Sequence, residues 1–177
     1  MRQDAGFTLI EVILSLILAG IMAAVAGMGI VSFAKGFVLV KKSTQTAQKA
    51  QLAMARLTRE LTELTSITDN SVSTKITFGN KSGTRQLGLA GDRIKIKIDA
   101  PVADLAAGDV LIDNVASFTL AYYKNYQSDP KVLWVLGTDN INLLTAILFE
   151  FKIKEVGKAD ASGGIGSFST IVSPRNI

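Results

Sequence analysis

One carboxylate stands in an otherwise apolar segment near the start of this chain. From Phe7 to Ala34 there are 28 residues, and Glu11 is the single charged side chain among them. An ionised carboxylate inside hydrocarbon costs at least about 2.5–3.5 kcal/mol, even on the insertion scales that penalise charge least. A plain membrane anchor gains nothing from such a residue. Glu11 therefore predicts a helix that finds a cationic partner, either inside the membrane or inside a polymer of subunits.

The apolar run that follows is long enough to cross a lipid bilayer. Val12–Ala34 contains 23 residues and no formal charge, and a helix of that length spans about 35 Å at about 1.5 Å per residue. A short polar leader, Met1-Arg2-Gln3-Asp4-Ala5-Gly6, precedes the apolar run. Glu11 falls in the first turn of the expected helix, where the helix dipole favours an anion.

The stretch Gly6-Phe7-Thr8-Leu9-Ile10-Glu11, ahead of an unbroken apolar helix, resembles the type III signal of type IV pilins and pseudopilins. This resemblance implies cleavage by a prepilin peptidase between Gly6 and Phe7, and then N-methylation of Phe7. Glycine suits the cleavage site, because a residue without Cβ lets the backbone lie extended against a protease. The new amine of Phe7 is cationic, and in a filament it and Glu11 can neutralise each other. Phe7 and Glu11 are thus the expected assembly residues.

Two other classes of protein begin with an apolar segment. A conventional secretory signal would be cut after Ala24-Val25-Ala26 and would release a soluble protein. The apolar run continues past that triplet, and the leader has Arg2 as its one basic side chain. An ordinary single-pass anchor is the second class, and it gives no reason for Glu11. We therefore favour the pilin-like interpretation.

The charges that flank the span bear on its orientation. Lys35, Lys41 and Lys42 follow the span whereas Arg2 precedes it, so the positive-inside rule mildly favours a cytoplasmic C-terminal domain. The resemblance implies the opposite: a single-pass protein of the inner (cytoplasmic) membrane, with its head in the periplasm or outside the cell, incorporated into a filament or its tip. It also implies other pilin or pseudopilin subunits, the prepilin peptidase and methyltransferase, and the inner-membrane assembly platform as partners.

Beyond Lys42 the helical pattern becomes amphipathic. Apolar residues recur at spacings of three and four, which is one stripe on a helix: Ala47, Ala50, Met54, Leu57, Leu61 and Leu64. The side chains between them predict a solvated face: Gln45, Gln48, Lys49, Gln51, Arg56, Arg59, Glu60 and Glu63. We expect one helix from about Phe7 to about Ser66, with the stripe packed on the protein's own sheet. Gly27 and Gly29 flank Met28, where many major pilins have a proline, and mark a weak point in that helix.

The second half of the chain has the pattern of strands and turns. Arg93–Ile98, Phe118–Tyr122 and Ile147–Ile153 alternate apolar and polar residues, as half-buried strands do. Shorter strands are expected at Lys75–Phe78, Gln86–Leu89, Val110–Ile112, Val132–Val135 and Phe168–Val172. The predicted fold class is α+β: a long N-terminal helix, with a membrane-spanning half and an amphipathic half, packed on a C-terminal antiparallel β-sheet head as in pilins.

These patterns divide the chain into four regions. We expect a signal leader at 1–6, a transmembrane and assembly helix at 7–40, an amphipathic stalk helix at 41–68 and a β-rich globular head at 69–177. The resemblance extends less specifically into the stalk and head. The segments that resemble minor pilins and J-type pseudopilins of type II secretion systems are Gln51–Leu61, Asn114–Tyr123 and Phe168–Asn176.

The composition removes several classes of enzyme. The 177-residue chain has no His and no Cys, so His-based triads, thiol nucleophiles and the common zinc sites are absent. The acids Asp109, Asp113, Asp139 and Asp160 do not form a dense calcium-binding loop. The glycine-rich stretch Ala161–Ser167 lacks the lysine of a phosphate-binding loop and is expected to be a flexible loop. We expect no cofactor, no metal and no enzymatic activity.

The net charge of +4 raises the question of whether the protein binds nucleic acid. Residues 69–177 carry 12 basic and 11 acidic side chains, whereas residues 41–68 carry 5 basic and 2 acidic ones. Arg93, Lys95 and Lys97 share one strand, but such residues commonly serve solubility and edge protection. The charge distribution thus weakens the nucleic-acid interpretation, and the resemblance implies a structural minor pseudopilin or minor pilin that primes or caps a filament used in protein secretion. The alternative is a minor pilin of a type IV pilus or DNA-uptake system whose head binds DNA or a surface ligand.

Overall fold

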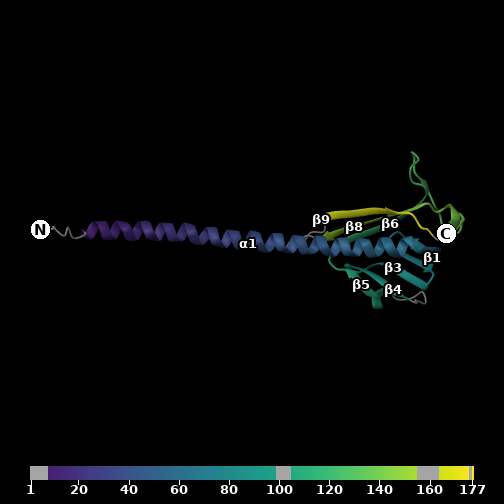
Figure 1. Ribbon diagram of the computed structural model, residues 1–177, viewed down its shortest axis with the longest axis horizontal. Coiled ribbons are helices and arrows are strands. Elements are labelled where there is room, and N and C mark those ends of the chain that lie inside the picture. Colours follow the sequence, from purple (N-terminus) through teal and green to yellow (C-terminus); the bar gives the residue numbers. More distant parts are fainter. Residues whose placement is uncertain (1–7, 99–104, 155–163, 176) are drawn as a thin grey trace. The chain divides into compact units, whose positions relative to one another are not determined.

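A single helix opens the structure and continues into the second of two compact units. The computed structural model describes residues 8–98, 105–154, 164–175 and 177. The first unit comprises residues 1–46 and the second residues 47–177. Helix α1 spans Leu9–Thr62 and therefore belongs to both (Figure 1). The positions of the two units relative to each other are not determined, so each is described by itself.

The second unit contains two antiparallel sheets. Five strands form the first sheet in the order β1-β2-β3-β4-β5, and four form the second in the order β7-β6-β8-β9. The first sheet consists of β1 Leu64–Val72, β2 Lys75–Asn80, β3 Gly83–Ala90, β4 Arg93–Ile98 and β5 Asp109–Ile112. The second consists of β6 Val115–Asn125, β7 Val132–Leu133, β8 Ala146–Lys154 and β9 Gly164–Val172. Two short 3-10 helices, η1 Leu105–Ala107 and η2 Ile141–Leu143, lie in the connections.

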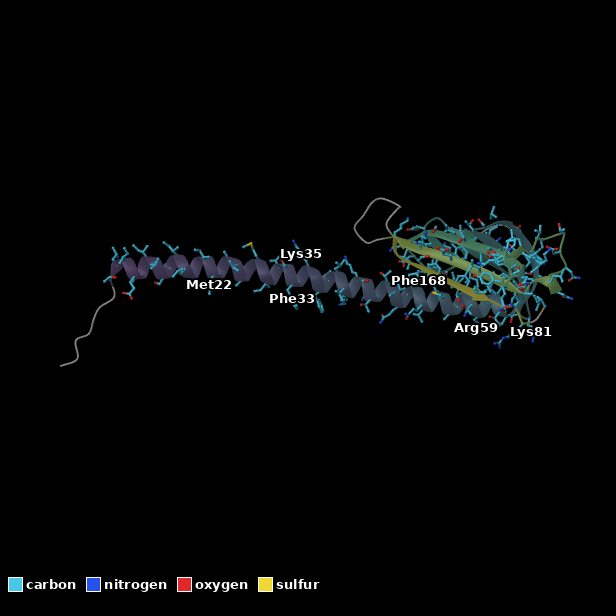
Figure 2. The ribbon with its side chains drawn as sticks, turned by 90° about the horizontal axis from the view of Figure 1, so that it is seen from above. Met22, Phe33, Lys35, Arg59, Lys81 and Phe168 are labelled. Carbon is cyan, nitrogen blue, oxygen red and sulfur yellow. The ribbon has the colours of Figure 1, made fainter. Side chains whose placement is uncertain are left out.

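The core of this unit lies between the sheets and the C-terminal part of α1. Within the second unit, the sheets lie above and below the helix in one view (Figure 1) and on the same side of it in the perpendicular view (Figure 2), so the helix lies across both sheets. Its buried apolar residues are Ala50, Ala53, Leu57 and Leu61, and they join one cluster with inward-facing residues of both sheets. Four phenylalanines supply much of the volume, as each is almost completely buried: Phe78, Phe118, Phe149 and Phe151. The apolar stripe on the helix therefore packs on the protein's own sheets, as the spacing predicted.

The α+β class is confirmed, and all eight predicted strands are present. The prediction of one sheet was wrong, because the strands divide into two sheets. The chain passes between them at Asn114, which has a φ of 58°. A single asparagine in this left-handed region turns the chain sharply. The alternation of apolar and polar residues predicts a strand, but it does not indicate which of two sheets the strand joins.

The predicted C-terminal boundary of the helix was also wrong. Helix α1 ends at Thr62, and Leu64–Val72 forms β1, a strand that the periodicity did not identify. Leu64 continues the apolar stripe of the helix and is fully buried. Its spacing is therefore compatible with a last helical residue and with the first residue of a strand. The residues that follow it, Thr65 to Thr68, include three β-branched side chains, and these favour a strand. The β structure of the head thus begins before residue 69.

Candidate functional site

The candidate site is the N-terminal end of α1. Thr8 precedes the helix, and its backbone carbonyl accepts hydrogen bonds from the amides of Glu11 and Val12 at 3.1 and 3.3 Å. The Thr8 hydroxyl also accepts from the Glu11 amide, at 3.4 Å. Thr8 is therefore the N-cap, and Glu11 occupies the third helical position, which is the Ser/Thr-x-x-Glu spacing of a capping box. Thr8 was not among the predicted site residues, although the Thr-x-x-Glu spacing is a sequence signal for such a cap.

The Glu11 carboxylate is exposed and far along the helix from any basic side chain. The next charged residue in the chain is Lys35, 24 residues later, which corresponds to about 36 Å along a helix. A cationic partner for Glu11 must therefore come from the chain's N-terminal end or from another molecule. The predicted site residues Gly6 and Phe7 lie outside the described residues. Cleavage between them, methylation of Phe7 and its pairing with Glu11 stay predictions.

The helix surface around Glu11 is apolar on every side. Eighteen residues of α1 reach a mean hydropathy of 2.6, and none of that window is buried within the protein. Side chains such as Met22 and Phe33 project outward along the helix (Figure 2), with 73% and 77% of their surface exposed. A contiguous apolar surface of this size marks a site that lipid or other protein covers. By length and composition this helix can cross a membrane.

The glycines in the apolar part of α1 have no packing role within the described part of the chain. The helix is continuous through Gly20, Gly27, Gly29 and Gly36, and a Cβ built on any of them meets nothing within 4 Å. Each glycine lowers helix stability by about 1 kcal/mol relative to alanine. Small residues let helices approach closely in lipid. Loosening of the helix at Gly27 and Gly29 stays a prediction.

One residue of the predicted solvated face of the stalk is not solvated. Glu60 is only 2% exposed. Its carboxylate lies 2.9 Å from Arg56 of the same helix and 3.2 Å from Arg85 of β3. The contact with Arg85 joins Arg85 Nη1 to Glu60 Oε2. It is an ion pair by distance but not a hydrogen bond by angle, so neither atom has a hydrogen-bond partner. Glu60 therefore joins the stalk helix to the five-stranded sheet.

Three of the basic side chains on the head strands β4 and β8 contact other groups of the head. Arg93 lies 3.8 Å from Asp92, and the Lys95 ammonium donates to the carbonyl of Ala106. Lys152 lies 4.0 Å from Glu150 on the other sheet. These contacts are surface ion pairs or hydrogen bonds within the head, and surface pairs of this kind contribute little energy. They favour a role in solubility over one in binding polyanions.

A hollow of about 680 Å³ lies at one end of the four-stranded sheet. Next to it, Lys124 bonds to Asp139 at 2.9 Å, and Asp139 also accepts from the amide of Val135. The Lys124 hydrogen bond, with that of Val135, lowers the pKa of the Asp139 carboxyl. Side chains of mixed polarity line the hollow: Lys124, Asn125, Tyr126, Gln127, Thr145, Ala146, Ile171 and Ser173. Within the described residues, no three acidic side chains gather to hold a metal ion.

A family model described as the prokaryotic N-terminal methylation motif matches residues 1–27. Comparison with curated proteins gives no significant match. The matched range contains the polar leader, Thr8, Glu11 and the first part of the exposed apolar helix. The chain therefore carries the N-terminal methylation signature of type IV pilins and pseudopilins, on one long helix that is followed by antiparallel sheets.

Proposed function

We propose that this protein is a structural, non-enzymatic subunit of a type IV filament-type assembly, and most specifically a minor pseudopilin or minor pilin that primes the assembly or caps its tip. The observation that carries the proposal is Glu11, an exposed carboxylate in the apolar N-terminal part of α1, with no basic side chain within reach among the residues that the structure describes. The methylation motif over residues 1–27 supports assembly with other pilin subunits and processing by a prepilin peptidase. The assembly would serve protein secretion across the cell envelope.

The proposed mechanism has three steps. The protein inserts into the inner membrane through α1, with the head on the periplasmic side, and the peptidase removes the leader after Gly6. The N-terminal helices then associate laterally, and the Phe7 amine of one subunit meets Glu11 of a neighbour. Pairing offsets a desolvation cost that neither charge could bear alone. Last, the envelope machinery extracts the subunit into a filament, and the head contacts other subunits or exported protein.

Processing can be tested by intact mass. We expect the mature chain to have the mass of residues 7–177 plus one methyl group, because the peptidase removes the leader and the methyltransferase then modifies Phe7. N-terminal sequencing of the same sample should show N-methylphenylalanine. A chain that begins at Gly27 would instead identify a secretory signal cut after Ala26. A chain that keeps Met1 would identify an ordinary anchor, and either result would contradict the proposal.

A DNA-retention assay distinguishes the proposed structural function from the alternative, in which the head captures DNA. We expect the full chain in detergent to show no salt-dependent retention on double-stranded DNA at low ionic strength. The physical reason is that the 12 basic side chains of residues 69–177 are nearly balanced by 11 acidic ones, and affinity for DNA rises with the number of lysines and arginines that contact phosphate. Retention that falls steeply with added salt would instead favour the DNA-uptake interpretation.

A further inference from the structure

The two sheets end in four edge strands, and three of them are poor surfaces for pairing. Strand β1 has three register shifts against β2 and carries Asp69. Strand β5 has four residues, beginning with Asp109, and β7 has two. Short length, irregular register and charge are the features by which proteins keep an edge strand from pairing with another chain.

Strand β9 is long and uncharged, and its register is regular over most of its length. It is nine residues long and contains no charged side chain and no proline: Gly-Ile-Gly-Ser-Phe-Ser-Thr-Ile-Val. Its register against β8 is regular from Gly166 to Val172, and the one shift lies beyond Gly166. Within the described residues, no backbone group of β9 bonds to any element other than β8. One edge of β9 therefore presents a straight row of backbone donors and acceptors.

Apolar side chains on β9 are also incompletely covered. Phe168 faces the core side of the sheet, stacks on the buried Phe151 at 5.4 Å between ring centroids and remains half-buried. Phe168, labelled in Figure 2, packs against the edge of the buried core. On the opposite face, Ile171 is 43% exposed. A strand added beside β9 would cover both side chains, and its backbone would form hydrogen bonds with the unpaired donors and acceptors of β9. Recognition of this kind is β-strand addition.

We propose that the edge of β9 is a strand-addition site that takes an extended, uncharged segment of a different pilin-like subunit as a fifth strand of this sheet. The inference rests on the proposed function, because assembly holds neighbouring heads close together and so raises their effective concentration. The partner's segment would place apolar or small side chains beside Phe168 and Ile171. It would carry no charge where it faces the core side.

A second copy of this chain fits the site poorly. Its own β1, β5 and β7 edges are irregular or short, so they could not match the regular stretch of β9. The remaining choice is β9 against β9. In antiparallel pairing about a two-fold axis, the copy's stalk helix, which runs alongside the sheets (Figure 1), would point the opposite way. The stalk segments of the two copies, residues 47–62, would therefore run in opposite directions, which does not suit subunits that associate side by side.

The absence of cysteine allows a direct test by site-specific cross-linking. Ser169 on β9 and Thr119 on β6 are exposed and lie in one cross-strand row, joined through Glu150. We would label Ser169→Cys and Thr119→Cys full chains with a benzophenone maleimide and irradiate them in assembled filaments. We expect Ser169→Cys to give a conjugate whose partner, by mass spectrometry, is a different subunit that also begins with a methylated residue. The Thr119→Cys yield should be at least about fivefold lower, because β8 pairs with β6 on one side of Thr119 and, on the other side, the amide of the adjacent Leu120 already donates to the carbonyl of Ser73.

A blocking variant separates strand addition from mere proximity. Adding Ile171→Lys to Ser169→Cys places a lysine on the edge at an already exposed position, and should lower the conjugate yield about fivefold. The same lysine at Thr119 should leave the yield unchanged. Equal yields from the two cysteines, a partner that is a second copy, or an unaffected Ile171→Lys variant would each overturn the proposal. Incorporation is measured first: a chain that does not enter filaments contradicts the proposed function, whereas one that enters without a β9 conjugate contradicts this inference alone.

Discussion

Replacing Glu11 by glutamine should lower incorporation of the subunit into filaments by roughly two orders of magnitude. Removing one partner of a buried ion pair costs about 3–5 kcal/mol, because the other charge is left without compensation, and about 1.4 kcal/mol corresponds to a tenfold change in equilibrium. Here the charge left uncompensated is the Phe7 amine. Filaments sheared from cells that express the variant at the wild-type level, quantified by immunoblotting, provide the measurement.

The glutamine substitution isolates the charge from the helix cap. Glutamine also satisfies the capping-box pattern at the third helical position, so the Thr8 cap should persist in Glu11→Gln. Glu63→Gln is the matched control, since Glu63 is half-exposed just after the end of α1 and lies 3.5 Å from Arg59 in the last turn of that helix. A pair of that kind contributes about 0.3–0.5 kcal/mol, and the control should assemble normally. Undiminished incorporation of Glu11→Gln would remove the basis of the proposed mechanism.

The N-terminal motif could be recognised from the sequence because all of its residues are close together in the chain. A carboxylate among apolar residues needs a partner whatever the fold of the head, and the Gly6–Glu11 spacing is contiguous. The same holds for strands such as β4, whose alternation from Arg93 to Ile98 matches its observed bounds. Each of these features depends only on the order of neighbouring residues, so it can be read from a short segment without knowledge of the rest of the fold.

What the sequence could not predict depends on distant residues. Glu60 lies three residues after Leu57 and four before Leu64, so its spacing is that of the buried face, yet its charge placed it among the solvated residues. Its second partner, Arg85, lies 25 residues later on β3, and no local pattern joins the two. Leu64 shows the same limit, because a buried residue at helical spacing suited both the end of α1 and the start of β1. The open edge of β9 likewise depends on a strand order that no local pattern specifies.

Tyr122 is a second group whose surroundings arise only in the fold. It packs against Trp134 at 6.2 Å between ring centroids, and its hydroxyl is buried without a hydrogen-bond partner among the described residues. Burial, with a smaller effect of Asp69, raises the pKa of the Tyr122 hydroxyl. The phenol is therefore neutral at any physiological pH, and it contributes to the core as an aromatic ring.

Glu60→Ala should destabilise the head more than any other single substitution of a charged stalk residue, by about 3 kcal/mol. The reason is the asymmetry of buried ion pairs: Arg85, whose side chain is 12% exposed, would keep its charge and lose the carboxylate that compensates it. Arg56 matters less, since its side chain is 40% exposed and water can solvate it. For a head of this size we expect the thermal midpoint to fall by about 10 °C, measured on the full chain in detergent by circular dichroism.

A paired substitution distinguishes lost charge compensation from lost packing. Glu60→Met together with Arg85→Met removes both charges and keeps apolar volume between α1 and β3, so most of the stability should return, as replacing a buried ion pair by hydrophobic residues is often neutral or stabilising. Glu63→Ala on the exposed face should cost no more than about 0.5 kcal/mol. If Glu60→Ala behaved like Glu63→Ala, the ion pair would be incidental to the docking of the stalk. If the double variant were as unstable as Glu60→Ala, the loss would come from packing and the carboxylate itself would not hold the helix to the sheet.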